Sequence, residues 1–267
     1  MMNTININTF LKMKKNTEKI VSLTVYDASF AKLLLQAGVE LLLVGDSLGM
    51  VIQGHGSTLP VTVEDIIYHS RHVRRGAGEG AYIMVDMPFM SYATPLTGLK
   101  NAARLLQEGG ANIVKLEGGT EILPTISLLA ERGIPSCAHL GLMPQQVHKI
   151  GGYKVQGREQ VQADKMLQAA QMLVTAGTDM LLLECVPSAL AEKITQAVTV
   201  PVIGIGAGPH CDGQVLVLYD ILGLNQGHKP KFYKNYMVAG RDVAAAIAAF
   251  TQEVKTGVYP GPEHSYD

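Results

Sequence analysis

Four acidic residues, Asp46, Asp86, Glu117 and Glu184, each stand just past a short apolar run of strand length. Segments long enough to form helices separate these runs. In a barrel of alternating strands and helices, polar side chains at the strand ends converge on one face. Four carboxylates gathered there would repel one another unless a cation or a proton came between them. The pattern therefore predicts a (β/α)₈ barrel that carries a metal-dependent active site.

The alternation of strands and helices extends along the whole chain. The expected strands cover residues 20–25, 41–44, 82–85, 112–116, 134–138, 180–183, 200–205 and 216–219. The expected helices cover residues 8–15, 29–36, 63–75, 95–108, 159–176, 187–197 and 240–256, with one more that ends near residue 132. No low-complexity linker divides the sequence, so we expect one α/β domain over residues 1–267, a TIM barrel with a short N-terminal helix. A doubly wound open sheet is the competing architecture, but it would place its ligand at one glycine-rich crevice, whereas polar residues here follow at least five strands.

Charge and cysteine content restrict the class of protein. A formal net charge of −1 gives no electrostatic basis for binding nucleic acid. The cysteines, Cys137, Cys185 and Cys211, are far apart in sequence, which argues against disulfides or a zinc site and favours small buried side chains in a reducing compartment. No apolar run approaches the roughly 20 residues of a membrane span, and the first residues lack a signal-peptide pattern. We therefore expect a cytoplasmic protein that binds neither membrane nor nucleic acid.

The four carboxylates are better candidates for ligands than for helix caps. An aspartate after a strand commonly caps the next helix, but no helix is expected soon after Asp46 or Asp86. Glutamate is a poor cap, so Glu117 and Glu184 fit that interpretation less well still. Carboxylate oxygens are hard ligands, and Mg²⁺ is typically held by one or two of them together with water and substrate oxygens. These residues therefore favour a magnesium site.

Two further residues and one loop are candidates for the site. Lys115 lies two residues before Glu117 on the same side of its strand, where it could neutralise an anionic substrate or form a buried pair with Glu117. His139 follows the run 134–138 and could contact a substrate carbonyl, shuttle a proton or be a core histidine. The run GIGAGPH at residues 204–210 resembles a phosphate-binding turn only weakly. We interpret it as a tight turn where a ligand approaches the backbone.

Taken together, ten segments make the chain resemble one family over about residues 18–260. They are LLLVGDSLGM at 41–50, STLPVT at 57–62, DMPF at 86–89, SYAT at 91–94, NAAR at 101–104, GGANIVKLEGG at 109–119, HLGLMPQ at 139–145, GGYKVQGR at 151–158, ECVP at 184–187 and CDGQVLV at 211–217. On these motifs the sequence resembles the ketopantoate hydroxymethyltransferase (3-methyl-2-oxobutanoate hydroxymethyltransferase) family. The resemblance implies a (β/α)₈ barrel of the phosphoenolpyruvate- and pyruvate-handling type, one Mg²⁺ per subunit and a homo-oligomer, usually a decamer.

The same resemblance implies roles for particular residues. Asp46 and Asp86 would be direct metal ligands, and Glu117 would join the metal site directly or through water. Ser47, Lys115 and His139, together with the aspartates, would contact the keto acid, and Glu184 would be the general base. The implied reaction transfers a hydroxymethyl group from the co-substrate 5,10-methylenetetrahydrofolate to 3-methyl-2-oxobutanoate through a Mg²⁺-stabilised enolate. Its product is 2-dehydropantoate, in the first step of the synthesis of pantothenate, the coenzyme A precursor.

Two other functions are compatible with four acids at the mouth of a barrel. A lyase that cleaves a C–C bond would use the same metal and enolate chemistry, but the loop signature of such enzymes, of the Lys-Lys-Cys-Gly-His kind, is absent from the sequence. A non-catalytic protein that binds a keto acid or pantoate is the third possibility. Four carboxylates kept together without a metal would be costly, which disfavours it.

Overall fold

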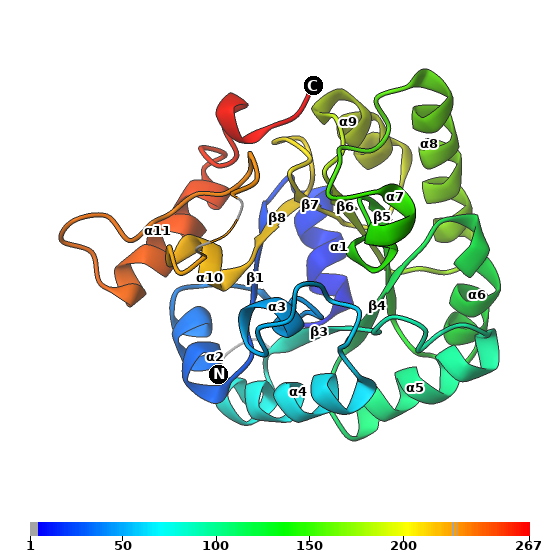
Figure 1. Ribbon diagram of the computed structural model, residues 1–267, viewed down its shortest axis with the longest axis horizontal. Helices are drawn as coiled ribbons and strands as arrows, with labels where there is room; N and C mark the ends of the chain where they lie inside the picture. Colours follow the sequence, from blue (N-terminus) through cyan, green and yellow to red (C-terminus); the bar gives the residue numbers. More distant parts are fainter. Residues whose placement is uncertain (1–4, 226, 228) are drawn as a thin grey trace.

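Eight parallel strands close into a barrel in chain order, and helices surround it (Figure 1). The computed structural model describes residues 5–225, 227 and 229–267. The strands are β1 (Ile20–Thr24), β2 (Leu41–Val44), β3 (Tyr82–Asp86), β4 (Ile113–Glu117), β5 (Ser136–Gly141), β6 (Met180–Glu184), β7 (Val202–Ile205) and β8 (Gly213–Leu216). The outer helices are α2 (Ala28–Gln36), α4 (Val63–Ala77), α5 (Pro95–Gln107), α6 (Leu123–Glu131), α8 (Gln160–Thr175), α9 (Ser188–Ala197) and α11 (Val243–Lys255). The predicted (β/α)₈ barrel is thus confirmed, and the open sheet is excluded.

Shorter helices occupy the loops and one end of the barrel. They are α1 (Ile7–Lys15), α3 (Leu48–Val51), α7 (Val147–Ile150) and α10 (Leu218–Ile221), with 3₁₀ turns η1 (Thr120–Ile122), η2 (Pro144–Gln146) and η3 (Pro262–His264). The N-terminal helix α1 covers the ends where the strands begin: the Phe10 ring meets Tyr82 edge-on at 5.1 Å, and Lys14 Nζ lies 2.7 Å from an Asp212 oxygen. With that end closed, ligands reach the barrel from the opposite end.

Three of the four acidic residues are the last residues of strands rather than the residues just after them. Asp86, Glu117 and Glu184 end β3, β4 and β6. Strand β5 also runs further than predicted, to Gly141, so His139 lies inside it. Pairing causes both differences, because Glu117 faces His139 across the β4–β5 pair and Glu184 faces Gly141 across the β5–β6 pair. Inclusion in the sheet fixes the backbone of these residues.

The expected eighth strand at 216–219 is wrong. Strand β8 is Gly213–Leu216, and α10 already begins at Leu218. The polar residue Gln214 concealed this strand in the sequence, but its Nε2 donates to Gly208 O at 3.0 Å, so the buried amide is satisfied. Gly213 is needed where β8 meets β1, because a Cβ there would lie 2.5 Å from Ile20 O.

The glycine-rich run at 204–210 forms the connection from β7 to β8, where the described residues contain no helix. Gly206 and Gly208 have φ of 60° and 76°, which glycine adopts without strain. A Cβ on Gly206 would lie 2.5 Å from the Phe232 ring, and one on Gly208 2.2 Å from Ser188 Oγ. The turn is tight as predicted, and the side chains of Phe232 and Ser188 lie close to these glycines; the approach of a ligand to this backbone stays a prediction.

The cysteines and the helices bear on two other expectations. Cys137, Cys185 and Cys211 are free and buried, as predicted for small apolar side chains. Within the described ranges, none of the helices combines the length and the apolar character needed to cross a lipid bilayer.

Candidate active site

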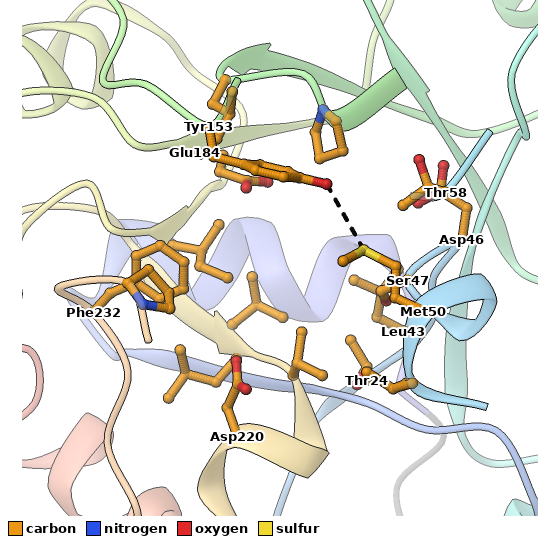
Figure 2. Close-up of a pocket in the computed structure, with 18 of the residues that line it drawn as sticks. Thr24, Leu43, Asp46, Ser47, Met50, Thr58, Tyr153, Glu184, Asp220 and Phe232 are labelled. Atoms are coloured by element: carbon orange, nitrogen blue, oxygen red, sulfur yellow. Dashed lines mark hydrogen bonds between the residues drawn. The ribbon is translucent and has the colours of Figure 1, made fainter. Parts of the chain in front are cut away.

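A cavity of about 560 Å³ opens where the strands end, and the long loops after β2 and β5 help to form it (Figure 2). The structure brings all the site residues expected from the sequence into its lining: Asp46, Ser47, Asp86, Lys115, Glu117, His139 and Glu184. The two aspartates, Lys115, Glu117 and His139 are each at most 4% exposed. Charged groups removed from water to this degree must satisfy one another or a ligand.

Asp46 and Asp86 are joined through the backbone. The Asp46 N–H donates to Asp86 Oδ2 at 3.0 Å. Gly45 leaves room for this approach, because a Cβ there would lie 3.4 Å from Asp86 Oδ2 and 2.9 Å from Ser47 Oγ. Helix α3 starts only two residues after Asp46, contrary to expectation, yet the Asp46 carboxylate does not cap it and instead accepts from Gln145 Nε2 at 2.9 Å. Neither aspartate is a helix cap, which leaves both available for a ligand.

Lys115 supplies the positive charge of the cluster. Its Nζ lies 3.0 Å from Asp86 Oδ1, across the β3–β4 pair in which the two residues face each other. Burial by itself lowers the pKa of Lys115, but the carboxylates of Asp86, Glu117 and Asp46 outweigh burial and raise that pKa above its usual value. Lys115 is therefore a permanent cation at neutral pH.

Burial and mutual repulsion weaken the acids of the cluster. Burial raises the pKa of Asp46 well above its usual value, and the charges of Asp86 and Glu117 add to the effect. Burial likewise raises the pKa of Glu117 to about 8, although Lys115 and the Gln145 N–H oppose it. Glu117 Oε2 accepts from that N–H at 2.9 Å, while Oε1 has no hydrogen-bond partner among the residues that the structure describes. One cation does not neutralise the cluster.

His139 links Lys115 to Glu184. Burial, and then the Lys115 charge, lower the pKa of His139 well below its usual value, so the ring is neutral at pH 7. Lys115 Nζ lies 3.2 Å from His139 Nδ1. An ammonium group can only donate, so we assign Nδ1 as the acceptor and place the ring proton on Nε2. That atom lies 3.4 Å from Glu184 Oε2 but has no hydrogen-bond partner among the residues that the structure describes, so its proton is buried and unpaired beside the carboxylate.

Glu184 reaches the cavity from another side. It ends β6, two strands beyond the strand of Glu117, and Figure 2 shows it across the cavity from Asp46. Burial raises the pKa of Glu184 to about 8; Lys115 opposes this and the negative charges of Asp46 and Asp86 add to it. A carboxylate whose pKa is near neutrality is a much stronger base than an ordinary one.

Gln145 and Tyr92 also build the site, and the sequence reasoning gave neither a role. The Gln145 amide donates to Asp46 Oδ2 and to Met87 O, and its N–H donates to Glu117. The Tyr92 hydroxyl donates to Gln145 Oε1 at 2.6 Å and accepts from the Glu117 N–H at 3.2 Å. Gln145 stood in the motif at 139–145, which was the only signal that could have revealed it.

Replacement of Gln145 by leucine is expected to lower the free energy of unfolding by about 1–3 kcal/mol, since Asp46 and Tyr92 would lose a buried partner. Urea titration measures the loss. Gln146→Leu is the matched control, because the half-buried Gln146 amide contacts only a methionine sulfur, at 3.6 Å. Equal losses in the two variants would show that the Gln145 contacts contribute nothing specific.

Ser47 and the rim of the cavity connect the two long loops. Ser47 Oγ is 2.8 Å from the Tyr26 hydroxyl. At the mouth, the Tyr153 hydroxyl from the loop after β5 lies 3.8 Å from the Met50 sulfur in α3, as the dashed line in Figure 2 shows. The loops after β2 and β5 therefore meet over the cavity.

The residues present suit a hard divalent cation. In this arrangement no three Asp, Glu, His or Cys side chains within the described part of the chain are placed to hold an ion together. However, the donors in reach are carboxyl oxygens, the three acids outnumber the one cation Lys115, and Glu117 Oε1 has no hydrogen-bond partner among the described residues. Oxygen donors with an excess of negative charge are the environment that Mg²⁺ prefers.

Comparison with known proteins decides the family. A family model described as ketopantoate hydroxymethyltransferase matches residues 4–262. The chain belongs to the ketopantoate hydroxymethyltransferase family. Members of this family are transferases, so the resemblance found in the sequence motifs is confirmed and the chain is an enzyme.

Individual relatives agree with membership of the ketopantoate hydroxymethyltransferase family. A 3-methyl-2-oxobutanoate hydroxymethyltransferase of Marinomonas sp. (strain MWYL1) is 58% identical over 98% of this chain and 94% of its own length. One of the same name from Shewanella loihica is 54% identical over 99% of this chain and the whole of its own. A phosphonopyruvate hydrolase, solved in complex with oxalate and Mg²⁺, has a TM-score of 0.62 at 12% identity and covers 98% of this chain and 93% of its own. That likeness supports the fold alone.

Proposed function

We propose that the protein transfers a hydroxymethyl group from 5,10-methylenetetrahydrofolate to 3-methyl-2-oxobutanoate and so forms 2-dehydropantoate, in the first step of pantothenate biosynthesis. The names of its relatives support the keto acid as substrate. The observation that carries the proposal is the position of Glu184, a carboxylate with a pKa of about 8 that shares a cavity with a buried cluster of acids and Lys115. A base on one side of the cavity and a charged cluster on the other suit the removal of a proton from the carbon next to a ketone.

Asp46 and Asp86 would hold Mg²⁺, and Glu117 would join them directly or through water. When bound, the ion supplies Lewis-acid polarisation of the keto oxygen. Lys115 places a fixed positive charge beside the same carboxylates, where it attracts the substrate carboxylate and stabilises negative charge that develops on the keto oxygen. Ser47 offers a hydroxyl at the edge of this cluster.

Glu184 would take the proton from C3 of the keto acid. His139 would remain neutral, with its Nε2 atom 3.4 Å from the Glu184 carboxylate and free of other hydrogen bonds within the described residues, so its proton is available to the substrate or to Glu184. The C3–H bond breaks, and the resulting carbon nucleophile forms a bond to the one-carbon unit of the folate. Water supplies the hydroxyl group, so the keto acid, 5,10-methylenetetrahydrofolate and water give 2-dehydropantoate and tetrahydrofolate.

Purified protein is expected to form 2-dehydropantoate only when keto acid, 5,10-methylenetetrahydrofolate and Mg²⁺ are all present, because base, metal and one-carbon donor each supply a separate part of the reaction. Chromatography with mass detection follows the product, and EDTA should abolish it. A matched incubation without folate should still exchange the C3 proton with deuterated water. Product formed without folate, or undiminished by EDTA, would refute the proposal.

A further inference from the structure

One part of the cavity lies away from the carboxylate cluster and has a different character. Figure 2 shows Phe232 and Asp220 across the cavity from Asp46 and Thr58. Apolar and aromatic side chains dominate this lobe, which we define by Ile205, Tyr219, Leu224, Pro230, Phe232 and Tyr266. The apolar part of the keto acid is a single isopropyl group, which would cover only a small part of this surface. The lobe is available to a second, larger and flatter ligand.

Asp220 also lines this lobe, and it is 5% exposed. Its Oδ1 accepts from Asn225 Nδ2 at 3.0 Å, and Oδ2 has no hydrogen-bond partner among residues 5–225, 227 and 229–267. In Figure 2 the carboxylate points into the cavity. A buried carboxylate among apolar side chains is costly unless it receives hydrogen bonds. The lobe therefore suits a planar ligand that carries hydrogen-bond donors on one edge.

The outer rim of the lobe carries the opposite charge. Lys229 and Lys231 are exposed and flank Pro230, which lines the cavity. Lys231 Nζ lies 5.8 Å from the centre of the Tyr266 ring, so it stands next to the same wall. The lobe is thus acidic inside, apolar along its walls and basic at its rim. This order of properties matches a ligand with a hydrogen-bond-donating head, an aromatic middle and an anionic tail.

We propose that this lobe binds the folate co-substrate head first, with Asp220 accepting from N3–H and the 2-amino group of the pterin. Two parallel donors on one planar edge match the two oxygens of a carboxylate. The aromatic walls then cover the pterin and aminobenzoyl rings, and Lys229 and Lys231 face the glutamyl carboxylates. This inference rests on the proposed function, because it assigns a site to the co-substrate of that reaction. The alternative is that Asp220 only fastens Asn225 and its loop.

The test compares tetrahydrofolate with its 2-desamino analogue by titration calorimetry, in the wild type and in Asp220→Asn. We expect the wild type to bind tetrahydrofolate about 10- to 100-fold more tightly than the analogue, the range for a hydrogen bond to a charged group. In Asp220→Asn that preference should fall below about threefold, because the analogue never used the missing oxygen. If Asp220 only fastens the loop, the variant weakens both ligands equally and the preference persists.

A wild type that binds the two ligands equally would overturn the inference, even if the variant did not fold. The exchange of the keto acid C3 proton without folate separates this result from failure of the proposed function. That exchange should stay within about twofold of the wild type in Asp220→Asn, since the inference places Asp220 against the folate and not against the keto acid. The wild type could bind tetrahydrofolate and its 2-desamino analogue equally and still exchange the C3 proton and form product with folate. That result would reject the Asp220 site but not the proposed reaction.

The role of Lys229 and Lys231 at the rim is tested with a pterin that lacks the glutamyl tail of folate. Replacement of Lys229 and Lys231 by alanine should weaken tetrahydrofolate binding about 2- to 5-fold per lysine at low salt, the range for exposed charge pairs. The same double variant should bind 6-methyltetrahydropterin, which has no glutamate, as the wild type does. Equal effects on both ligands would contradict the head-first orientation.

Discussion

Glu184→Gln is expected to slow exchange of the C3 proton of 3-methyl-2-oxobutanoate by about 10²- to 10⁴-fold, the usual contribution of a positioned general base. The amide keeps the size of the side chain and its place beside His139 but cannot accept the proton. Proton NMR in deuterated water with Mg²⁺ and without folate measures the step directly. Binding of the keto acid, measured by calorimetry, should change little.

The pH dependence of this exchange has a defined sign. Burial raises the pKa of Glu184 to about 8, so at lower pH the base is protonated and the rate should fall tenfold per pH unit. Bound Mg²⁺ adds positive charge nearby and lowers that pKa, so the plateau should begin below pH 8. Glu192→Gln on α9, whose carboxylate is 42% exposed beside His210, is the matched control. Wild-type exchange in Glu184→Gln would remove this residue from the role of base.

Lys115→Met should destabilise the metal-free protein by about 3–5 kcal/mol, the cost of leaving a buried charge without its partner. Lys115 is the cation that offsets Asp86, Glu117 and Asp46. Chemical denaturation in EDTA measures the loss, and Mg²⁺ should restore part of it because a second cation then replaces the ammonium. Lys14→Met provides a control pair at the far end of the barrel, where Lys14 contacts Asp212 and is 17% exposed.

The loss in Lys115→Met should grow as pH rises. Burial raises the pKa of Asp46 and Glu117 above their unfolded values, and removal of Lys115 raises them further. A carboxyl with a raised folded-state pKa stabilises the fold below its unfolded pKa and loses that contribution as pH rises through the folded value. The variant should therefore be least affected near pH 5 and most affected above pH 8. A loss that is independent of both pH and Mg²⁺ would contradict the electrostatic role of Lys115.

The barrel could be predicted because its strands are buried on both faces. Runs such as Leu41–Val44 face the barrel interior on one side and helices on the other, so they are continuously apolar and easily recognised. Strand β8 lacks that signal: Gly213 and Gln214 are tolerated there only because of close contact with Ile20 and a hydrogen bond to Gly208. Such compensation depends on neighbours distant in sequence and cannot be read from the residues themselves.

In the site, too, some residues could be predicted from the sequence and others could not. Asp46, Asp86, Glu117 and Glu184 could be located because their positions at strand ends determine where they point. Gln145 could not, because it lies in a 3₁₀ turn whose path depends on the loop around it. The direction of the His139 proton likewise depends on a lysine of the neighbouring strand.

Because strand order in the barrel equals chain order, the acids of the site divide between the two halves of the chain, with Gln145 from the second half bonded to Asp46 and Glu117 of the first. Asp46, Asp86 and Glu117 belong to β2–β4 and their loops, whereas Glu184 and Asp220 come from β6 and the segment after β8. On the proposed assignment, substitutions in the second half would change the base or the folate site while the carboxylates proposed to hold the metal stay where they are.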